Sequence, residues 1–306
     1  MIDVIIPAYN AHDTIKRTLY SISIQKNIDF KVYIINDCSK YDYSKEVNFF
    51  KNFMSIKELK LDKNSGPGVA REHGINNSNS DYIVFIDADD YLYYPNSLYD
   101  LYTAITNNNS DLVISNFIYE RDNEIVIKKK NNVWLHGKIY KRKFLNDNDI
   151  HFNDTYSNED NGFNRLIFLH QPKVSYLDIE TYVYSENSNS ITRRNNRAHK
   201  FDGLEWYCYN INWAIEQVIK KGHITDDIVY SALGVLVSMY YYYLEFYEIN
   251  DVSLILKWSK NIKIIYDKYK GDLINFNLVN IFLRNKEEEY TNIVKRLSFY
   301  EFLELI

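Results

Sequence analysis

Short apolar runs alternate with amphipathic stretches from residue 1 to about residue 120 of this 306-residue chain. The runs are almost continuously apolar and rich in β-branched residues, which favours strands buried on both faces of a mostly parallel sheet. The stretches between them have helical spacing, as in a doubly wound α/β layer. The predicted strands are 4–6, 32–35, 59–61, 82–86 and 112–114, and the predicted helices are 14–25, 44–53, 67–77 and 96–107.

Beyond residue 120 the pattern becomes mixed, and after residue 200 the strand signals stop. We predict strands at 133–140 and 174–185 with a helix at 160–170 between them. Helical periodicity then predicts helices at 201–220, 226–247, 252–269 and 287–305. We therefore place a domain boundary near residue 200, with an α/β domain over residues 1–200 and a helical C-terminal region over residues 201–306.

The composition is that of an ordinary globular protein and excludes some partners. Hydrophobic residues make up 46% of the chain, enough for a sizeable core, and the formal net charge of -5 gives no reason to expect a nucleic acid. Two cysteines, Cys38 and Cys208, are too few for a disulfide framework or a zinc site. Without a signal-peptide pattern or an apolar stretch of about 20 residues, we expect a cytoplasmic protein. Peripheral contact with the inner face of the membrane stays open.

The sharpest chemical signal is a cluster of acids after one predicted strand. In parallel sheets, ligands bind beyond the carboxyl ends of the strands. Asp37 follows the second strand, and Asp87, Asp89 and Asp90 follow the fourth. Three carboxylates within four residues suit Mg²⁺ or Mn²⁺, which also coordinate phosphate oxygens. A solvated acidic turn or a helix cap is the alternative, and the position at a strand end argues against it.

Two further segments carry candidate chemistry. The sequence from Asn64 to Arg71 has Gly66 followed by a proline, which predicts a loop entering a helix whose N-terminus can bind an anion, with Arg71 one turn inside. Neither a Walker loop nor a dinucleotide fingerprint is present. Glu159 and Asp160 precede an apolar helical pattern, where they could also simply stabilise the first helical turn.

Taken together and in this order, the motifs resemble those of the family 2 glycosyltransferases with the GT-A fold. The resemblance covers roughly residues 1–195 and rests on five segments, 4–10, 36–39, 64–71, 87–92 and 159–160. It implies a GT-A type, Rossmann-like, mostly parallel sheet with flanking helices, followed by the helical C-terminal region. The domain at 1–200 would then be catalytic, and the region at 201–306 would have an acceptor, oligomer or membrane-surface role.

The resemblance also implies how a nucleotide sugar is held. The residues at the end of the first strand would flank the base, and Asp37 would hydrogen-bond the uracil ring. Asp87 would bind the ribose or the sugar, and the segment 188–193 would close over the diphosphate. The implied nucleotide-sugar-binding residues are Pro7, Ala8, Tyr9, Asp37, Asn64, Arg71, Asp87, Ala88, Ser190 and Arg193.

For the reaction, the resemblance implies Mn²⁺ or Mg²⁺ bound by Asp89 and a general base at Asp160 beside Glu159. The expected enzyme moves a sugar from UDP-GlcNAc, UDP-Glc, UDP-Gal or UDP-GalNAc to a hydroxyl. The acceptor would be a cell-surface glycan, a lipid-linked sugar or a teichoic-acid-like polymer. Direct displacement assisted by one base should invert the anomeric centre.

Some points depart from the family or stay open. Cys38 stands where the family often has glycine, which should alter that turn. Trp134 and His136 either line the sugar or acceptor site or pack structurally. The run of tyrosines at 240–243 covers every helix face, so at least two of them should point away from a single core, at an oligomer interface or between helices.

Two other functions compete with the transferase reading. A nucleotidyltransferase or pyrophosphorylase-like enzyme should have a glycine- and lysine/arginine-rich loop after the first strand, but this chain has Tyr9 to Asp13 there. A non-catalytic carbohydrate-binding protein on a degenerate GT-A fold would be expected to have lost some of its acids. Asp37, Asp87, Asp89 and Asp160 are all present.

Overall fold

A computed structural model describes the chain except for residues 122–123, 156, 186–196, 223–224, 248–251, 271–275 and 288–296. Contacts divide the chain into two compact units, Met1–Asn210 and Ile211–Ile306. The division falls inside one long helix, α7 (Arg197–Lys220), ten residues beyond the boundary predicted from the sequence.

The first unit is built on a sheet whose nine described strands form the order β3-β2-β1-β4-β8-β6-β9-β5, with β7 paired to β6. The register of each pair shows that six of them run in one direction, while β5, β7 and β8 run in the other. The predicted mostly parallel sheet is therefore confirmed. The strands are β1 (Ile2–Ala8), β2 (Phe30–Asn36), β3 (Ser55–Lys60), β4 (Tyr82–Phe85), β5 (Tyr91–Leu92), β6 (Leu112–Arg121), β7 (Glu124–Lys128), β8 (Lys138–Lys141) and β9 (Val174–Tyr184).

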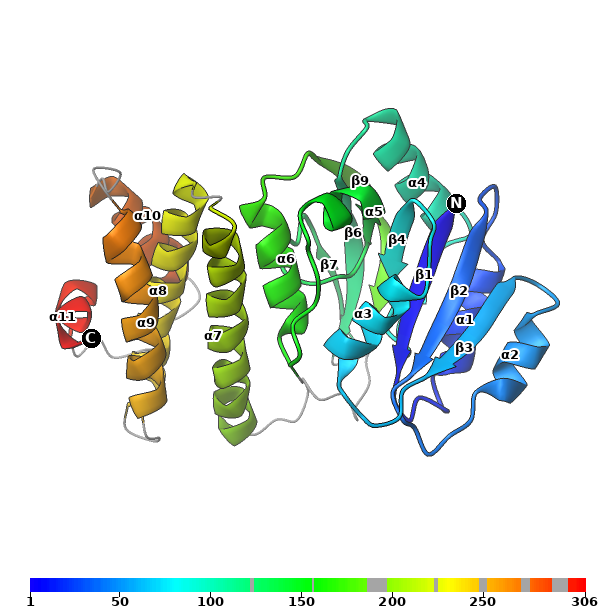
Figure 1. Cartoon of the computed structure of the whole chain (residues 1–306), viewed down its shortest axis with the longest axis horizontal. Helices are drawn as coiled ribbons and strands as arrows, with labels where there is room; N and C mark the ends of the chain where they lie inside the picture. Colours follow the sequence, from blue (N-terminus) through cyan, green and yellow to red (C-terminus); the bar gives the residue numbers. More distant parts are fainter. Residues whose placement is uncertain are drawn as a thin grey trace. The chain divides into compact units, whose positions relative to one another are not determined.

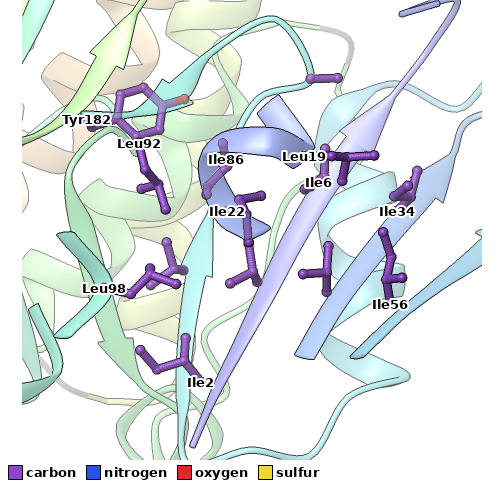
Figure 2. Packing of buried hydrophobic residues seen from close by; sticks show 14 of the residues in the cluster. Ile2, Ile6, Leu19, Ile22, Ile34, Ile56, Ile86, Leu92, Leu98 and Tyr182 are labelled. Atoms are coloured by element: carbon purple, nitrogen blue, oxygen red, sulfur yellow. The ribbon is translucent and has the colours of Figure 1, made fainter. Parts of the chain in front are cut away.

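Helices cover both faces of this sheet, because the strands are apolar on both sides. On one face, Ile6 of β1 and Ile34 of β2 pack with Leu19 and Ile22 of α1 in a buried core that also includes Ile86 (Figure 2). On the other face, α3 lies against β1 and β2 (Figure 1). The helices of this unit are α1 (Ile15–Ser23), α2 (Ser44–Phe50), α3 (Pro67–Asn76), α4 (Ser97–Asn107), α5 (Arg142–Asp147) and α6 (Glu159–Leu169).

A buried ion pair holds three strands together at the sheet edge where β1 and β4 begin. The fully buried Asp3 carboxylate accepts hydrogen bonds from Ser80 N at 2.6 Å and from Arg142 Nη2 at 2.9 Å. Arg142 Nε in turn donates to the Ser80 carbonyl at 2.6 Å. Because a buried charge is costly unless it is paired, this network fixes the end of β8 beside the starts of β1 and β4.

Several sequence-based elements differ from the structure. The strand predicted at 133–140 is wrong over its first half, because Gly137 has a left-handed φ of +65° and an extended segment cannot continue through it. Of the helix predicted at 287–305, the structure shows α11 (Phe299–Leu305), and Leu297 and Ser298 before it are not helical. Residues 288–296 lie outside the described residues, and Glu287 is the last residue of α10 (Phe276–Glu287). The elements β5, β7, α5 and α10 were not predicted, and the first three span only two to six residues each.

The second unit contains the C-terminal part of α7 together with α8 (Asp226–Phe246), α9 (Ser253–Tyr269), α10 and α11 (Phe299–Leu305). Of the two alternatives for the tyrosines of 240–243, the structure shows packing between helices. Tyr240, Tyr241 and Tyr243 are buried because α8 is packed against α9, α10 and α11, and Tyr240 Oη donates to the Leu297 carbonyl at 2.7 Å. No helix among the described residues has the length and apolar character needed to span a membrane.

The close approach of α3 to β1 gives a stability prediction. A Cβ added at Gly74 would lie 2.4 Å from Cγ2 of Ile5, on a stiff β-branched side chain. Gly74→Ala should therefore lower the free energy of unfolding by about 1–3 kcal/mol through overpacking. The matched control Gly203→Ala, with nothing within 4 Å of its new Cβ, should stabilise helix α7 by about 0.5–1 kcal/mol. Urea unfolding followed by circular dichroism measures both, and equal effects of the two variants would contradict the packing.

Candidate active site

Polar residues from three strand ends meet at the carboxyl edge of β1, β2 and β4. Ala8 pairs with Asn36 in register, and the backbone N–H of Asp37 donates to the Ala8 carbonyl at 2.9 Å. The chain leaves β4 at Phe85 and continues into the acidic segment from Asp87 to Asp90. The sheet therefore brings these acids to one edge, where ligands of open α/β sheets bind.

At the β2 side of this edge, Asp37 organises the loop that enters α3. Its buried carboxylate accepts hydrogen bonds from the backbone N–H groups of Ser65 at 2.7 Å and Gly66 at 2.9 Å. Gly66 has a φ of +88°, which a side chain would disfavour. Burial raises the pKa of Asp37, although the two N–H groups favour the ionised form. Asp37 is thus a fixed acceptor beside the N-terminus of α3.

Cys38 adopts a left-handed conformation with a φ of +57°. This is the conformation that glycine adopts without strain. Asp37 still reaches both Ser65 and Gly66 with cysteine at this position, and an effect of Cys38 on the turn stays a prediction.

Arg71 of α3 lies at the centre of the site, buried and bonded to two carboxylates from distant segments. Its Nη2 donates to Asp87 Oδ1 at 2.6 Å, and its Nη1 donates to Glu159 Oε1 at 2.5 Å. Burial alone would lower the pKa of Arg71, but the two carboxylates outweigh burial and raise it. Burial likewise tends to raise the pKa of Asp87, yet Arg71 and His136 hold that pKa well below its usual range. Arg71 and Asp87 therefore both stay charged.

Asp87, Asp90 and His136 form a group whose ligand atoms all lie within 4.8 Å of one another. Asp90 is fully buried and accepts from Tyr182 Oη at 2.6 Å and from Ser185 N at 2.9 Å. Burial, together with the charges of Asp87 and Asp89, raises its pKa well above the ordinary value. Negative charge is thus concentrated here beyond what Arg71 neutralises.

His136 has the properties of a neutral ligand. Its Nε2 lies 3.5 Å from Asp87 Oδ2 and 3.7 Å from Asp90 Oδ2. Burial lowers its pKa despite the neighbouring Asp87 carboxylate. Its buried Nδ1 has no hydrogen-bond partner among the described residues. The two carboxylates of this group are ligands that fit Mn²⁺ or Mg²⁺. Asp89, the metal ligand implied by the resemblance, is half-buried and precedes Asp90 in the chain, but its carboxylate is not one of the three ligands of this group.

Asp160 stands in the first turn of α6, one residue after the Glu159 that binds Arg71. The helix begins after Asn158, which has a left-handed φ of +59°, and Asp160 is half-buried with Oδ1 accepting from Asn161 N at 2.7 Å. Burial, and then the charge of Glu159, raises the pKa of Asp160 to about 7. A carboxylate with such a pKa is matched to proton transfer near neutral pH.

Comparison with known proteins decides the family. Residues 3–158 match the family model described as Glycosyl transferase family 2. The chain belongs to this family. The predicted family and enzyme class, a glycosyltransferase, are thereby confirmed.

Two curated proteins that the chain resembles come from Staphylococcus aureus. The poly(ribitol-phosphate) beta-N-acetylglucosaminyltransferase TarS is 27% identical over 200 residues, which cover 60% of this chain and 35% of TarS. The poly(ribitol-phosphate) beta-N-acetylglucosaminyltransferase TarP is 28% identical over 226 residues, which cover 65% of this chain and 68% of TarP. The match to TarS thus spans about a third of the length of that relative.

The fold is also that of a family relative. The crystal structure of S. aureus TarS 1–349 in complex with UDP-GlcNAc superposes with a TM-score of 0.70 at 18% identity, covering 97% of this chain and 93% of that one. At this identity the match shows the fold alone, and it confirms the predicted GT-A type architecture with its helical C-terminal region.

Within this glycosyltransferase fold, the structure brings most of the predicted site residues to one edge. Asp37, Arg71, Asp87, Glu159 and Asp160 are linked as described. Asp89 is half-buried, with its carbonyl accepting from Arg17 Nη2 at 2.6 Å. The remaining described residues are half-buried Pro7, buried Ala8 and Ala88, and exposed Tyr9 and Asn64, whereas Ser190 and Arg193 lie outside the described residues.

Sequence reasoning did not show the buried contacts of three residues that shape the site. The sequence places Asp90 in the acidic cluster after the strand, but it does not reveal that Asp90 is fully buried. Tyr182 reaches Asp90 from 92 residues away, and no local pattern marks it. Lys138 is buried, and its Nζ donates to the Trp134 carbonyl; burial lowers its pKa to about 7 although the charge of Asp160 opposes the shift. Lys138 is the first residue of β8, and no sequence signal marks its burial.

The raised pKa of Asp160 predicts how stability depends on pH. The folded protein keeps a proton at Asp160 up to about pH 7, whereas the unfolded chain loses it near pH 4. Ionising Asp160 therefore lowers the stability of the wild type as the pH rises from 4 to 7, and the loss remains above pH 7. Asp160→Asn should raise the free energy of unfolding near pH 8 by about 2 kcal/mol, allowing for partial exposure, and by less near pH 5.

Urea unfolding in the presence of a chelator at the two pH values measures this difference. Asp154→Asn, at an exposed carboxylate of the same segment, serves as the control and should change stability little at either pH. An Asp160→Asn effect of the same size near pH 5 and near pH 8 would refute a raised pKa.

Proposed function

We propose that this chain transfers a sugar from a UDP-sugar to a hydroxyl group with inversion of the anomeric centre. UDP-GlcNAc is the first donor to test, because TarS and TarP are named as N-acetylglucosaminyltransferases. The acceptor would be a cell-surface glycan, a lipid-linked sugar or a teichoic-acid-like polymer. The observation that carries the proposal is the linkage of Asp87, Arg71 and Glu159, which places the acidic segment after β4 next to Asp160.

The donor nucleoside would lie at the β1–β2 side of the edge. Asp37 presents fixed carboxylate oxygens there, and a carboxylate accepts a hydrogen bond from a uracil N–H. Tyr9 is 52% exposed beside the same strand ends and offers a ring face to the base. The backbone amides at the start of α3 are used by Asp37, so a direct phosphate contact with Ser65 N or Gly66 N is not part of this proposal.

Mn²⁺ or Mg²⁺ would be held by Asp89 together with the carboxylates of Asp87 or Asp90. A bound divalent cation would supply Lewis-acid stabilisation of the negative charge on the diphosphate leaving group. The surplus of carboxylates over fixed cations at this edge supports a cation there. Arg71 is turned into the protein by its two ion pairs, and we propose that it positions Asp87 rather than contacting the nucleoside.

Asp160 would act as the general base. The acceptor hydroxyl attacks the anomeric carbon as its proton passes to Asp160, and the bond from that carbon to the diphosphate oxygen breaks. A single displacement of this kind inverts the anomeric centre, so an α-linked donor gives a β-linked product. Glu159 would position the base indirectly, since its carboxylate holds Arg71 at the start of α6.

The competing functions are less well supported. A nucleotidyltransferase would need a glycine- and lysine/arginine-rich loop after β1, which this chain lacks. A degenerate binding protein would not be expected to keep both Asp87, which is paired with Arg71, and Asp160. We further propose a catalytic domain at residues 1–200, an accessory helical region at 201–306 and a cytoplasmic location. Homo-oligomer formation and contact with the inner face of the membrane stay predictions.

Donor use gives the direct test of this function. The purified protein with Mn²⁺ should release UDP from one member of a UDP-sugar panel, and a chelator should abolish the release. Asp89→Ala should lower the turnover number by about 10²-fold or more because it removes a metal ligand, while the exposed Asp81→Ala should leave it unchanged. Absence of nucleotide binding by calorimetry with metal present would sink the transferase proposal.

The proposed base gives a second, independent test. Asp160→Asn should lower the turnover number by about 10²–10⁴-fold while leaving UDP binding intact, since general base catalysis contributes factors of that size. In the wild type, the rate should rise with pH and level off above about 7, because only ionised Asp160 accepts the proton. A rate that is independent of pH between 5 and 8, or full activity of Asp160→Asn, would assign the base elsewhere.

A further inference from the structure

A continuous strip of aromatic rings leads away from the catalytic carboxylates on the side opposite Asp37. The ring of His136 stacks on Tyr184 with centroids 4.8 Å apart, and Tyr184 stacks on Tyr119 at 5.2 Å. The Trp134 ring lies beside both tyrosines, 5.9 Å from Tyr184 and 6.0 Å from Tyr119. We call Tyr119, Trp134 and Tyr184 the aromatic strip. All three are half-buried, so part of each side chain reaches solvent.

The aromatic strip ends at a lysine. Lys128, the last residue of β7, has its Nζ 5.5 Å from the centre of the Tyr119 ring. It begins a run of three lysines, in which Lys129 and Lys130 are exposed. Lys130 Nζ lies over Tyr176 at 5.5 Å, whereas Lys129 is 3.9 Å from Asp178 and is partly neutralised. A cation–π contact thus holds the Lys128 ammonium group at the outer end of the strip, and Lys130 follows two residues later with its own contact to Tyr176.

The order of the sheet assigns this side to the acceptor. The proposed nucleoside site lies at β1 and β2, and the aromatic strip comes from β6, β9 and the loop before β8, on the other side of β4. The acidic group at the end of β4 lies between them, with His136 belonging to both the acidic group and the row of rings. A sugar or sugar alcohol packs its C–H groups on an aromatic face, and a phosphate binds ammonium groups. Since His136 and Tyr119 stack on Tyr184, the ring that offers a face is Trp134, which is tilted against both tyrosines. The acid that β6 carries next to Tyr119 is Glu120, whose carboxylate accepts hydrogen bonds from Tyr91 Oη and Ser185 Oγ.

We propose that the aromatic strip and Lys128 form the acceptor subsite, and that the acceptor is a polymer whose sugar or sugar-alcohol units are joined by phosphodiesters. The strip receives the unit that carries the attacking hydroxyl, and Lys128, with Lys130 beyond it, binds the phosphates that follow. This inference rests on the proposed function, whose acceptor class it narrows from three to one.

The test measures binding of the full chain to a short synthetic oligo(glycerol phosphate) by calorimetry, with UDP and Mn²⁺ present. Binding should weaken as salt is raised, and Lys128→Gln should weaken it roughly threefold to tenfold. Trp134→Ala should weaken it by about tenfold or more, and Trp134→Phe by less, because the phenyl ring retains a stacking face. Lys57→Gln is the matched control, since Lys57 Nζ also lies over a tyrosine, 4.8 Å from the Tyr33 ring, but on β3. It should change nothing.

Three other outcomes would overturn the proposal. If uncharged maltohexaose bound with the same affinity as the oligo(glycerol phosphate), the phosphates would not be required for recognition. Binding of phosphatidylglycerol vesicles that depends on Lys128, without binding of the oligomer, would make the lysines a membrane contact. Equal effects of Lys128→Gln and Lys57→Gln on oligomer binding would show that the phosphates are not bound specifically at Lys128.

UDP binding by the same samples separates this proposal from the function on which it rests. UDP binding that is retained without oligomer binding overturns the acceptor subsite alone. Oligomer binding that is retained without UDP binding overturns the donor assignment and still supports the strip as a polymer site. Unchanged UDP binding by the Trp134 variants also shows that they are folded.

Discussion

The pairing of buried Arg71 with two carboxylates is the interaction on which the catalytic edge depends. Asp87 is 16 residues from Arg71 in sequence and Glu159 is 88 residues away, so one guanidinium joins α3, the end of β4 and the start of α6. Removing it would leave buried Glu159 and half-buried Asp87 without their shared cation, which is costly because an unpaired buried charge is strongly destabilising. The close approach of α3 to the segment before α6 also requires Gly68, where a Cβ would lie 2.8 Å from the Asn153 carbonyl oxygen.

Different surroundings give the acids of this edge different states. Asp87 stays ionised beside Arg71, burial and like charges disfavour ionised Asp90 unless a cation is bound beside it, and the pKa of Asp160 lies near neutrality. Carboxyl groups of the same chemistry are therefore suited to cation binding, to structural hydrogen bonding and to proton transfer. The division follows from which segment brings a positive charge or a hydroxyl to each acid.

The sequence was sufficient to predict the alternating elements and the acids at the strand ends, because periodicity and strand-end position are local signals. It could not show that Arg71 would be buried between Asp87 and Glu159, since that contact depends on how α3 and α6 pack. It also missed the loop before β8, where one left-handed glycine ends an otherwise plausible strand. Tyr182 and Lys138 entered the site through long-range pairing that no short motif records. The predicted contacts of Ser190 and Arg193 stay predictions.

The reversed direction of β8 has a consequence for how this architecture can diversify. Because β8 runs against β4 and β6, its beginning, and not its end, lies at the catalytic edge. The loop before it, which carries Trp134 and His136, can therefore change in length or composition without shifting the hydrogen-bond register of β1 to β4. Under the proposed function, acceptor selection at this loop can evolve while the strands proposed to bind the nucleotide keep their geometry.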